Sequence, residues 1–265
     1  MPMKTALVTG AAQGLGLVTA GVLARAGFRL ILVDVQEMRV AVEKLRREGA
    51  EVLESARGDV GSAAFVRQLG EHIECRYTAV DVLVNNAGIS LIERAEDTTC
   101  EQWQRVMAVN LLAPFLLSKY LGAQMLKRKS GSIVNVASIA GLVGISHRSA
   151  YNASKHGLIG LTRTLAAEWG GRGVRVNAVC PGWIKTEMDA ADQGSGAYSD
   201  RDILDRVPME RFARPDDVAQ AIAFLADSEK SGFVNGATLN VDGGWTADGS
   251  WESLRVRARS SHAQD

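Results

Sequence analysis

The sequence has few cysteines and prolines and no excess of charge of either sign. The three cysteines, Cys75, Cys100 and Cys180, lie far apart and form neither a CxxC pair nor a zinc-ligand spacing, which predicts reduced thiols and no metal site. Thirty basic residues balance thirty acidic ones, so the net charge favours neither nucleic acid nor an anionic membrane surface as a partner. Five prolines suit a chain with long helices and short loops.

Long hydrophobic runs are missing as well. No stretch approaches the roughly 20 uninterrupted apolar residues of a membrane span. Residues 1–4 lead into an apolar strand without the hydrophobic region of a secretory signal. Hydrophobic residues make up 46% and charged residues 23% of the 265 positions, which is ordinary for a globular protein and excludes intrinsic disorder. We therefore expect a cytoplasmic protein with a sizeable core.

Short β-branched runs alternate with helical patterns along the chain. Continuous apolar strands separated by helices indicate a parallel sheet with helices on both faces, and right-handed crossovers make it a doubly wound, Rossmann-like sheet. We predict a single α/β domain over residues 1–245 with seven strands. The expected strands are 5–9, 30–34, 52–56, 80–85, 132–137, 174–180 and 238–241. The expected helices are 15–27, 36–49, 62–73, 101–127, 151–170 and 215–227.

Two segments depart from this alternation. Residues 185–214 are polar, contain glycines and are too long for an ordinary loop, which predicts a lid or binding loop over a site. Residues 246–265 form a C-terminal tail that carries Arg255, Arg257 and Arg259. We interpret the tail as a solvated terminus; in the alternative, its large apolar residues pack against a partner subunit.

A glycine-rich turn joins the first expected strand to the first helix. Residues 9–16 read TGAAQGLG, with Gly10, Gly14 and Gly16 in a GxxxGxG spacing. Glycines allow a tight turn and a close approach of the backbone, and a helix N-terminus presents free N–H groups to a pyrophosphate. By itself the spacing is a weak signal, because it differs from GxGxxG and glycine turns are common. Its place after the first strand predicts a dinucleotide site that includes Gln13 and Leu15.

Asp34 ends the second expected strand and favours one of the two nicotinamide cofactors. A carboxylate there accepts hydrogen bonds from the adenosine ribose hydroxyls and repels a 2′-phosphate. No basic residue stands at Gln13 to attract that phosphate. We therefore predict NAD rather than NADP. An alternative role for Asp34, compatible with the first, is an N-cap for the helix near Gln36.

Further polar residues follow the third and fourth strands. Asp59 and Val60 stand where a carboxylate meets the adenine amino group, and a cap for the helix near Ser62 is an equal alternative for Asp59. The residues that follow the fourth strand are further candidates for lining the cofactor groove, and a plain turn is the alternative interpretation. They are Asn86, Ala87 and Gly88, preceded by Asn85.

A tyrosine and a lysine four residues apart indicate proton transfer. Tyr151 and Lys155 at positions i and i+4 share one helical face, and a lysine cation favours the phenolate, which lowers the tyrosine pKa from about 10. Such a tyrosine can remove a hydroxyl proton. Ser138 ends the fifth strand, where ligands of open α/β sheets bind, and its hydroxyl can hydrogen-bond the substrate oxygen. A nucleophilic serine is disfavoured because no GxSxG elbow surrounds it.

Together these motifs resemble the short-chain dehydrogenases/reductases. The resemblance covers about residues 4–245 and rests on six motifs in the correct order. They are the glycine turn, Asn85–Gly88, Val109-Asn110-Leu111, Ser138, the Tyr151/Lys155 pair and Cys180-Pro181-Gly182.

The resemblance implies a role for each matching residue. Tyr151 would be the general acid/base, Lys155 would hold the nicotinamide ribose and lower the tyrosine pKa, and Ser138 would orient the substrate oxygen. Asn110 would support a water-linked proton relay; its alternative role, which can coexist, is a polar residue that interrupts a helix. The nicotinamide site would be shaped by Pro181, Gly182, Ile184 and Thr186. The helices at 101–127 and 151–170 resemble the dimer-forming pair of the family, which implies a homotetramer.

Substrate contacts are expected between Ser138 and Tyr151 and from the predicted lid. His147 is a candidate hydrogen-bond partner of the substrate, with an exposed loop histidine as the favoured alternative. Arg148 is a candidate partner of a substrate carboxylate, with a solvated surface charge as the favoured alternative. Trp183, after the Cys-Pro-Gly motif, is a further candidate contact.

Three substrate classes remain open for an enzyme that interconverts a secondary alcohol and a ketone. Sugars or polyols suit the polar lid and the aspartate. Short 3-hydroxy acids are suggested by Lys155-His156-Gly157 and Cys180–Trp183, which resemble 3-hydroxybutyrate dehydrogenases, although Ser90 and Ala140 stand where those enzymes place polar carboxylate binders. A 3-oxoacyl-carrier-protein reductase would dock its acidic carrier on Lys127–Lys129 and Arg172. Outside catalysis, the alternative is a nicotinamide-binding sensor.

Overall fold

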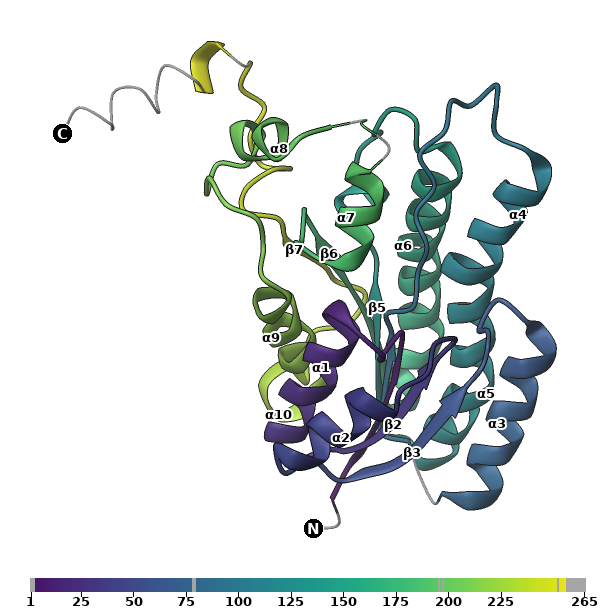
Figure 1. The fold of residues 1–265 in the computed structure, drawn as a ribbon. Coiled ribbons are helices and arrows are strands. Elements are labelled where there is room, and N and C mark those ends of the chain that lie inside the picture. Colours follow the sequence, from purple (N-terminus) through teal and green to yellow (C-terminus); the bar gives the residue numbers. More distant parts are fainter. Residues whose placement is uncertain (1–2, 78–79, 195, 197, 252, 256–265) are drawn as a thin grey trace.

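Seven strands form one parallel sheet in a computed structural model, which describes residues 3–77, 80–194, 196, 198–251 and 253–255. The strand order is β3-β2-β1-β4-β5-β6-β7, so the chain winds outward in both directions from β1, and the predicted Rossmann-like sheet is confirmed (Figure 1). The strands are β1 (Thr5–Thr9), β2 (Arg29–Asp34), β3 (Val52–Arg57), β4 (Val82–Asn85), β5 (Gly131–Val136), β6 (Val174–Pro181) and β7 (Thr238–Val241).

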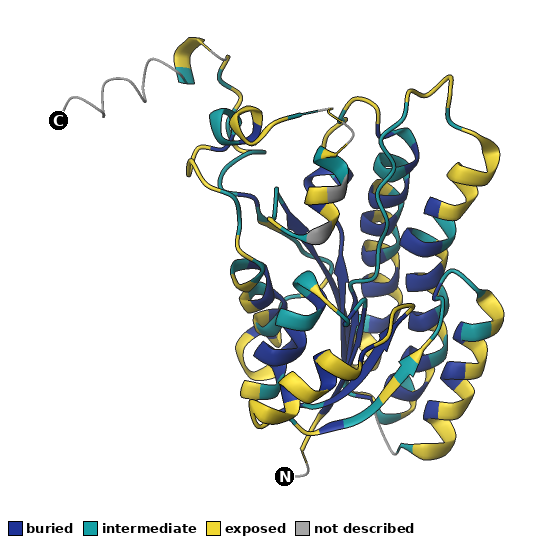
Figure 2. Ribbon diagram, in the orientation of Figure 1, coloured by how far each residue is buried: buried dark blue, intermediate teal, exposed yellow. Residues whose placement is uncertain are grey.

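Helices cover both faces of this sheet and bury two separate apolar layers. One layer lies under α1 (Gly14–Arg25), α2 (Arg39–Arg47) and α9 (Pro215–Ala226), and the other under α3 (Ala63–Arg76), α5 (Ala113–Arg128) and α6 (Ser149–Trp169). Successive residues of a strand point to opposite faces, so Val8 of β1 packs in the first layer and Leu7 in the second. The central strands are dark blue and the outer helix surfaces yellow in Figure 2, as expected for a parallel sheet covered on both sides, whereas the edge strands β3 and β7 are partly exposed.

The helix predicted at 101–127 is interrupted. The structure has α4 (Cys100–Met107), a π-helical turn η1 (Ala108–Leu112) and then α5. Pro114 explains the interruption, because it lacks the N–H that would bond the carbonyl of Asn110 in a regular α-helix. The whole run, residues 100–128, reaches a mean hydropathy of 1.4 over its most apolar window and is long enough to cross a membrane. Half of that window is buried inside the protein, as in the core helix of a globular fold.

The segment 185–214 contains two short helices instead of a plain loop. These are α7 (Glu187–Gln193) and α8 (Asp200–Arg206), each begun by a hydroxyl side chain, Thr186 or Ser199, that caps the helix. A further short helix, α10 (Ser228–Ser231), follows α9. In the tail, Arg255 lies 3.8 Å from Asp248, whereas the other two tail arginines, at 257 and 259, fall outside the described residues.

Candidate active site

A cavity of about 360 Å³ opens at the carboxyl ends of β1, β2, β4, β5 and β6, partly covered by α7. Most of the predicted site residues line it. They are Gly10, Gln13, Gly14, Leu15, Gly16, Asp34, Asp59, Val60, Asn86, Ala87, Gly88, Ser138, Arg148, Tyr151, Lys155, Pro181, Gly182, Trp183, Ile184 and Thr186. Two predicted residues do not: Asn110 is buried behind the wall, and His147 is exposed with φ of 60° on the outer side of its loop.

The glycine turn brings backbone against backbone at one end of the cavity. Gly10 has φ of +66°, and a Cβ on Gly16 would lie 1.9 Å from the carbonyl oxygen of Gly10. Helix α1 begins after Gln13 with no side-chain cap, so its first N–H groups face the cavity. An anion such as a pyrophosphate fits this backbone cradle, because the anion is bound by N–H donors and the glycines let the backbone approach it closely.

Asp34 is held by two backbone N–H groups. Its Oδ2 accepts from Ala12 N at 2.9 Å and its Oδ1 accepts from Gln36 N at 2.9 Å, and the residue is 8% exposed. It does not cap α2, which begins at Arg39 after a cap at Met38. The carboxylate therefore ties the glycine turn to the end of β2 and faces the cavity as a fixed negative charge.

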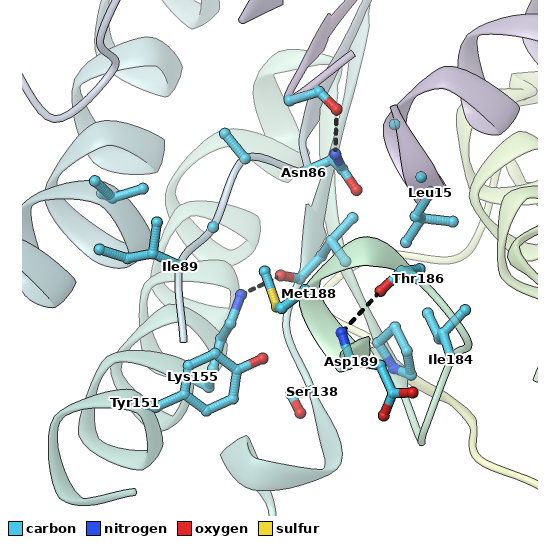
Figure 3. Close-up of a pocket in the computed structure, with 18 of the residues that line it drawn as sticks. Leu15, Asn86, Ile89, Ser138, Tyr151, Lys155, Ile184, Thr186, Met188 and Asp189 are labelled. Carbon is cyan, nitrogen blue, oxygen red and sulfur yellow. Dashed lines mark hydrogen bonds between the residues drawn. The ribbon is translucent and has the colours of Figure 1, made fainter. Parts of the chain in front are cut away.

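Asn86 joins the glycine turn to the end of β4. Its Nδ2 donates to the carbonyl oxygens of Gly10 at 3.2 Å (Figure 3) and of Thr9 at 2.8 Å. Its backbone N–H and that of Ala87 donate to Thr9 Oγ1 at 3.0 Å each. Asn85 points elsewhere, because its Nδ2 donates to Asn135 Oδ1 on β5. The role of Thr9 could not be predicted from the sequence, since a threonine at a strand end has no distinguishing local signal.

Asp59 makes an ion pair that the sequence did not predict. Arg105 on α4 donates to both of its carboxylate oxygens, from Nη1 at 2.7 Å and from Nη2 at 3.1 Å, and this pair lowers the pKa of Asp59. The cap of α3 is Ser62, whose Oγ accepts from Phe65 N. Asp59 and Arg105 both line the cavity, so a guanidinium accompanies the carboxylate there.

Ser138, Tyr151 and Lys155 meet at the other end of the cavity (Figure 3). Lys155 is buried, donates from Nζ to the carbonyl oxygen of Val136 at 2.8 Å, and lies 5.6 Å from the centre of the Tyr151 ring. Ser138 lines the cavity beside Tyr151, and its Oγ accepts from Ala140 N at 3.1 Å. The end of β5 and the first turn of α6 thus place a hydroxyl, a phenol and an amine together.

Burial shifts the pKa values of Tyr151 and Lys155 so that each side chain favours its neutral form. It raises the pKa of Tyr151, against the opposing effects of Ser138 and Arg148, and it lowers the pKa of Lys155 to about 8. The expectation that Lys155 lowers the tyrosine pKa is therefore not met in this structure. The physical reason is that both groups have left water together, and desolvation disfavours each charged form.

Asn110 holds the loop that follows β4 instead of facing the cavity. Its Oδ1 accepts from Ile89 N at 2.9 Å and its Nδ2 donates to Ile89 O at 2.9 Å and to Ser154 Oγ at 3.2 Å. The side chain is thereby satisfied in the π-helical turn, which agrees with the predicted role of a residue that interrupts a helix.

Arg148 is buried and paired, so the favoured expectation of a solvated surface charge is wrong. Its Nη2 donates to Asp192 Oδ2 at 2.9 Å and its Nη1 to Ser90 Oγ at 2.8 Å, and its side chain is 8% exposed. The guanidinium lies 5.4 Å from the ring of Trp183, which in turn contacts Tyr198. Asp192 comes from α7, 44 residues further along the chain, and no local signal marked it as a site residue.

Within the part of the chain that the structure describes, no group of three or more metal-ligating side chains could hold an ion. A nicotinamide dinucleotide, by contrast, suits the residues present. The backbone cradle lies at one end of the cavity, the carboxylate of Asp34 beside it, and the hydroxyl and phenol of Ser138 and Tyr151 at the other end.

Comparison with known proteins gives matches over most of the chain. A family model described as Enoyl-(Acyl carrier protein) reductase matches residues 10–246. D-threitol dehydrogenase of Mycolicibacterium smegmatis is 39% identical over 257 residues, covering 92% of this chain and 93% of that protein. A 3-oxoacyl-[acyl-carrier-protein] reductase of Synechocystis is 38% identical over 244 residues, with 91% and 96% covered. The crystal structure of a gluconate 5-dehydrogenase from Burkholderia cenocepacia, in complex with NADP and tartrate, has a TM-score of 0.87 at 33% identity and covers 94% of this chain and 97% of its own.

The matches extend from the glycine turn to the end of the sheet, which is the region that the motifs span. They agree with the doubly wound parallel sheet. The chain is a nicotinamide-dependent oxidoreductase acting on CH–OH groups, and it belongs to the family of short-chain dehydrogenases/reductases.

Proposed function

We propose that the chain, over a catalytic domain of residues 1–245, uses NAD to interconvert a secondary alcohol and a ketone. We propose as substrate a small sugar, polyol or hydroxy acid. The observation that carries this proposal is the meeting of Ser138, Tyr151 and Lys155 in a cavity whose far end is a backbone cradle for phosphate. When bound, the cofactor supplies the hydride acceptor or donor, and the protein must supply proton transfer and orientation.

Tyr151 acts as general acid and base in this proposal. In oxidation its phenolate takes the proton of the substrate hydroxyl, while Ser138 holds the same oxygen by a hydrogen bond. Lys155, fixed by the carbonyl of Val136, holds a positive charge next to the phenol as long as it is protonated. Because burial raises the pKa of Tyr151, the phenol dominates at neutral pH, which suits proton donation to a ketone. Alcohol oxidation should therefore accelerate as the pH rises.

The preference for NAD rests on Asp34. Its carboxylate is fixed by two backbone N–H groups and lines the cavity next to the glycine turn, where it can accept from ribose hydroxyls and repel a 2′-phosphate. The gluconate 5-dehydrogenase named above holds NADP, so cofactor choice needs a direct test. At equal subsaturating concentrations, NADH should be turned over faster than NADPH, and the reverse would contradict the proposal.

A carrier-protein reductase is the less favoured function. Its predicted docking residues lie at the amino ends of the strands, because Lys129 lies two residues before β5 and Arg172 two residues before β6. The cavity opens at the opposite, carboxyl ends. Lys127 is also paired with Glu74 at 3.1 Å. A carrier bound on these residues would lie at the end of the strands opposite the cavity.

We further propose a cytoplasmic homotetramer. The free thiols of Cys75 and Cys100 are exposed, which suits a reducing compartment. Apolar side chains on the helical run from α4 to α5 remain exposed in the single chain, as on a surface that a second subunit covers. They are Trp103, Leu112 and Phe115, with exposed fractions of 37%, 43% and 42%. Light scattering on the purified protein should give the mass of four chains.

Replacement of Tyr151 by Phe tests the catalytic assignment. It removes only the hydroxyl, so turnover should fall by about 10²- to 10⁴-fold, while the NADH dissociation constant, measured by fluorescence, stays within about twofold. Tyr120→Phe is the matched control, because Tyr120 packs on α5 against Gly70, away from the cavity. Activity that survives in Tyr151→Phe would exclude the mechanism.

A further inference from the structure

A buried charged cluster faces the reacting end of the cavity, beside the tyrosine that transfers the proton. It consists of Arg148, Ser90 and Asp192, all of which contact one another. Arg148 donates to both partners, and Ser90 Oγ donates to Asp192 Oδ2 at 3.0 Å. The side chains of Arg148 and Asp192 are only 8% and 16% exposed. A guanidinium taken this far out of water needs an anionic partner, and Asp192 provides it here.

The position of this cluster relative to Tyr151 makes it a candidate for substrate recognition. Arg148 precedes Tyr151 by three residues at the start of α6, and its guanidinium carbon lies 5.9 Å from the centre of the tyrosine ring. Trp183 lies against the same guanidinium at 5.4 Å. A group bound by Arg148 would therefore sit within a few bonds of the carbon whose hydroxyl faces Tyr151.

The two partners of the ion pair are anchored differently. The backbone of Arg148 belongs to the start of α6 and accepts from Asn152 N at 2.7 Å, next to a β-bridge with Glu93. Asp192 is on α7, a helix of seven residues outside the sheet. The pair is joined through Nη2 and Oδ2, whereas the other guanidinium pair of the cavity, Arg105 and Asp59, shares two hydrogen bonds. A carboxylate that enters the cavity can thus compete with Asp192 for Arg148.

We propose that Arg148 binds the carboxylate of the substrate and that Asp192 is the internal anion which the substrate displaces. This inference rests on the proposed function and narrows it to short hydroxy acids, including sugar acids, over neutral polyols. Exchange of one carboxylate for another leaves the buried charge unchanged, and a guanidinium binds a carboxylate through two parallel hydrogen bonds. Ser90 keeps a hydroxyl donor available to either anion. A neutral polyol brings no charge to replace that of Asp192.

A matched pair of substrates tests the proposal: an aldonate and the alditol of the same carbon number, such as threonate and threitol, with NAD⁺ as oxidant. Wild-type protein should show the higher kcat/KM for the aldonate. Asp192→Asn removes the competing charge, so KM for the aldonate should fall by about tenfold, and KM for the alditol should not fall.

Arg148→Met should act in the opposite sense and raise KM for the aldonate by about 30-fold or more, since charge-assisted hydrogen bonds contribute about 1.5–3 kcal/mol. KM for the alditol should change by less than about threefold. Because this variant leaves Asp192 buried without its cation, the double variant Arg148→Met/Asp192→Asn, which carries no unpaired charge, serves if the single one fails to fold. It too should lose the preference for the aldonate. Arg201→Met is the matched control, because Arg201 is exposed on α8 and pairs only at the surface with Asp205.

The outcomes separate this inference from the proposed function. If Asp192→Asn raises KM for the aldonate, or changes both substrates alike, Asp192 is not a competitor and the inference is wrong. If wild type prefers threitol and Arg148→Met does not discriminate, the inference fails while the dehydrogenase assignment stands. If no secondary alcohol of either class is oxidised although NADH binds, the proposed function itself fails.

Discussion

Replacement of Asp34 by Asn should shift cofactor preference toward NADP. The substitution keeps the shape of the side chain and removes its charge. Two unit charges about 5 Å apart repel by about 0.8 kcal/mol in bulk water and by a few times more at a protein surface. A 2′-phosphate carries about 1.5 to 2 charges, so the carboxylate should disfavour NADP by about 1–3 kcal/mol. The ratio of kcat/KM for NADP⁺ to that for NAD⁺ should therefore rise by about 10- to 100-fold.

The same substitution carries a stability cost that the structure specifies. Both carboxylate oxygens of Asp34 accept from backbone N–H groups, those of Ala12 and Gln36. An asparagine offers one oxygen and one NH₂ group, so one of the two N–H donors loses its acceptor, at about 1–3 kcal/mol. For a chain of this size that corresponds to a fall in Tm of roughly 2–10 °C.

Steady-state kinetics with both cofactors and a thermal melt measure the two effects separately. Asp81→Asn is the matched control. Asp81 also accepts a hydrogen bond from a backbone N–H, that of Thr5 at 2.8 Å, but it lies at the amino end of β4, away from the cofactor cavity at the carboxyl ends. It should lower Tm without changing the cofactor ratio. If Asp34→Asn leaves the ratio unchanged or moves it toward NAD, electrostatic repulsion by Asp34 does not set the preference.

Three further substitutions address the cradle, the buried lysine and the π-helical turn. Gly16→Ala places a Cβ 1.9 Å from a backbone carbonyl oxygen, so NADH binding measured by fluorescence should be lost. Lys155 has its pKa lowered to about 8, so between pH 8 and 10.5 the unfolded chain binds more protons than the folded one, and stability rises with pH. Lys155→Met should remove that rise of about 3 kcal/mol in denaturant unfolding. Asn110→Ala leaves two buried backbone groups of Ile89 unpaired and should lower the unfolding free energy by about 2–4 kcal/mol.

Each of these has an outcome that contradicts it. Gly21 lies in the same helix as Gly16 but has only ordinary contacts around it, with Arg25 Nη1 at 3.4 Å, so Gly21→Ala should bind NADH normally and gain up to about 1 kcal/mol. Equal loss of binding in both glycine variants would point to helix α1 as a whole. A difference between wild type and Lys155→Met that does not vary with pH would show that the lysine stays charged. Full stability of Asn110→Ala would mean that water replaces the side chain.

The sheet could be predicted from the sequence because its determinants are local. The central strands are runs of mostly apolar residues that are buried on both faces, and the boundaries predicted for 5–9 and 238–241 agree with β1 and β7. The site followed from the sheet, because the carboxyl ends of parallel strands meet at one edge. Residues as distant in sequence as Gly10, Ser138 and Gly182 could therefore be expected in one cavity.

What the sequence did not reveal depends on pairs that are far apart in the chain. The 101–127 pattern predicted one continuous helix, although Pro114 removes a hydrogen bond and Asn110 is engaged with a loop residue 21 positions away. A proline near a helix start is usually tolerated, so the pattern alone could not distinguish a first turn from an interruption. The helices α7 and α8 are short and polar, and their capping residues were present in the sequence without an apolar face to mark them.

The zero net charge of the chain conceals two guanidinium–carboxylate pairs in one cavity, one of them half-exposed and the other buried. Arg105 and Asp59 lie toward the glycine turn, and Arg148 and Asp192 toward Tyr151. Sequence reasoning treats a lone arginine as solvated, because long charged side chains are rarely buried without a partner. That rule failed for Arg148 because its partner is on another element, and the pair places a buried cation beside Tyr151. If Arg148 served only to fix α7, a neutral pair of the same size would serve as well and at lower desolvation cost. The kinetics of the double variant Arg148→Met/Asp192→Asn on an acid and on its alcohol therefore decide between a structural and a substrate-binding role.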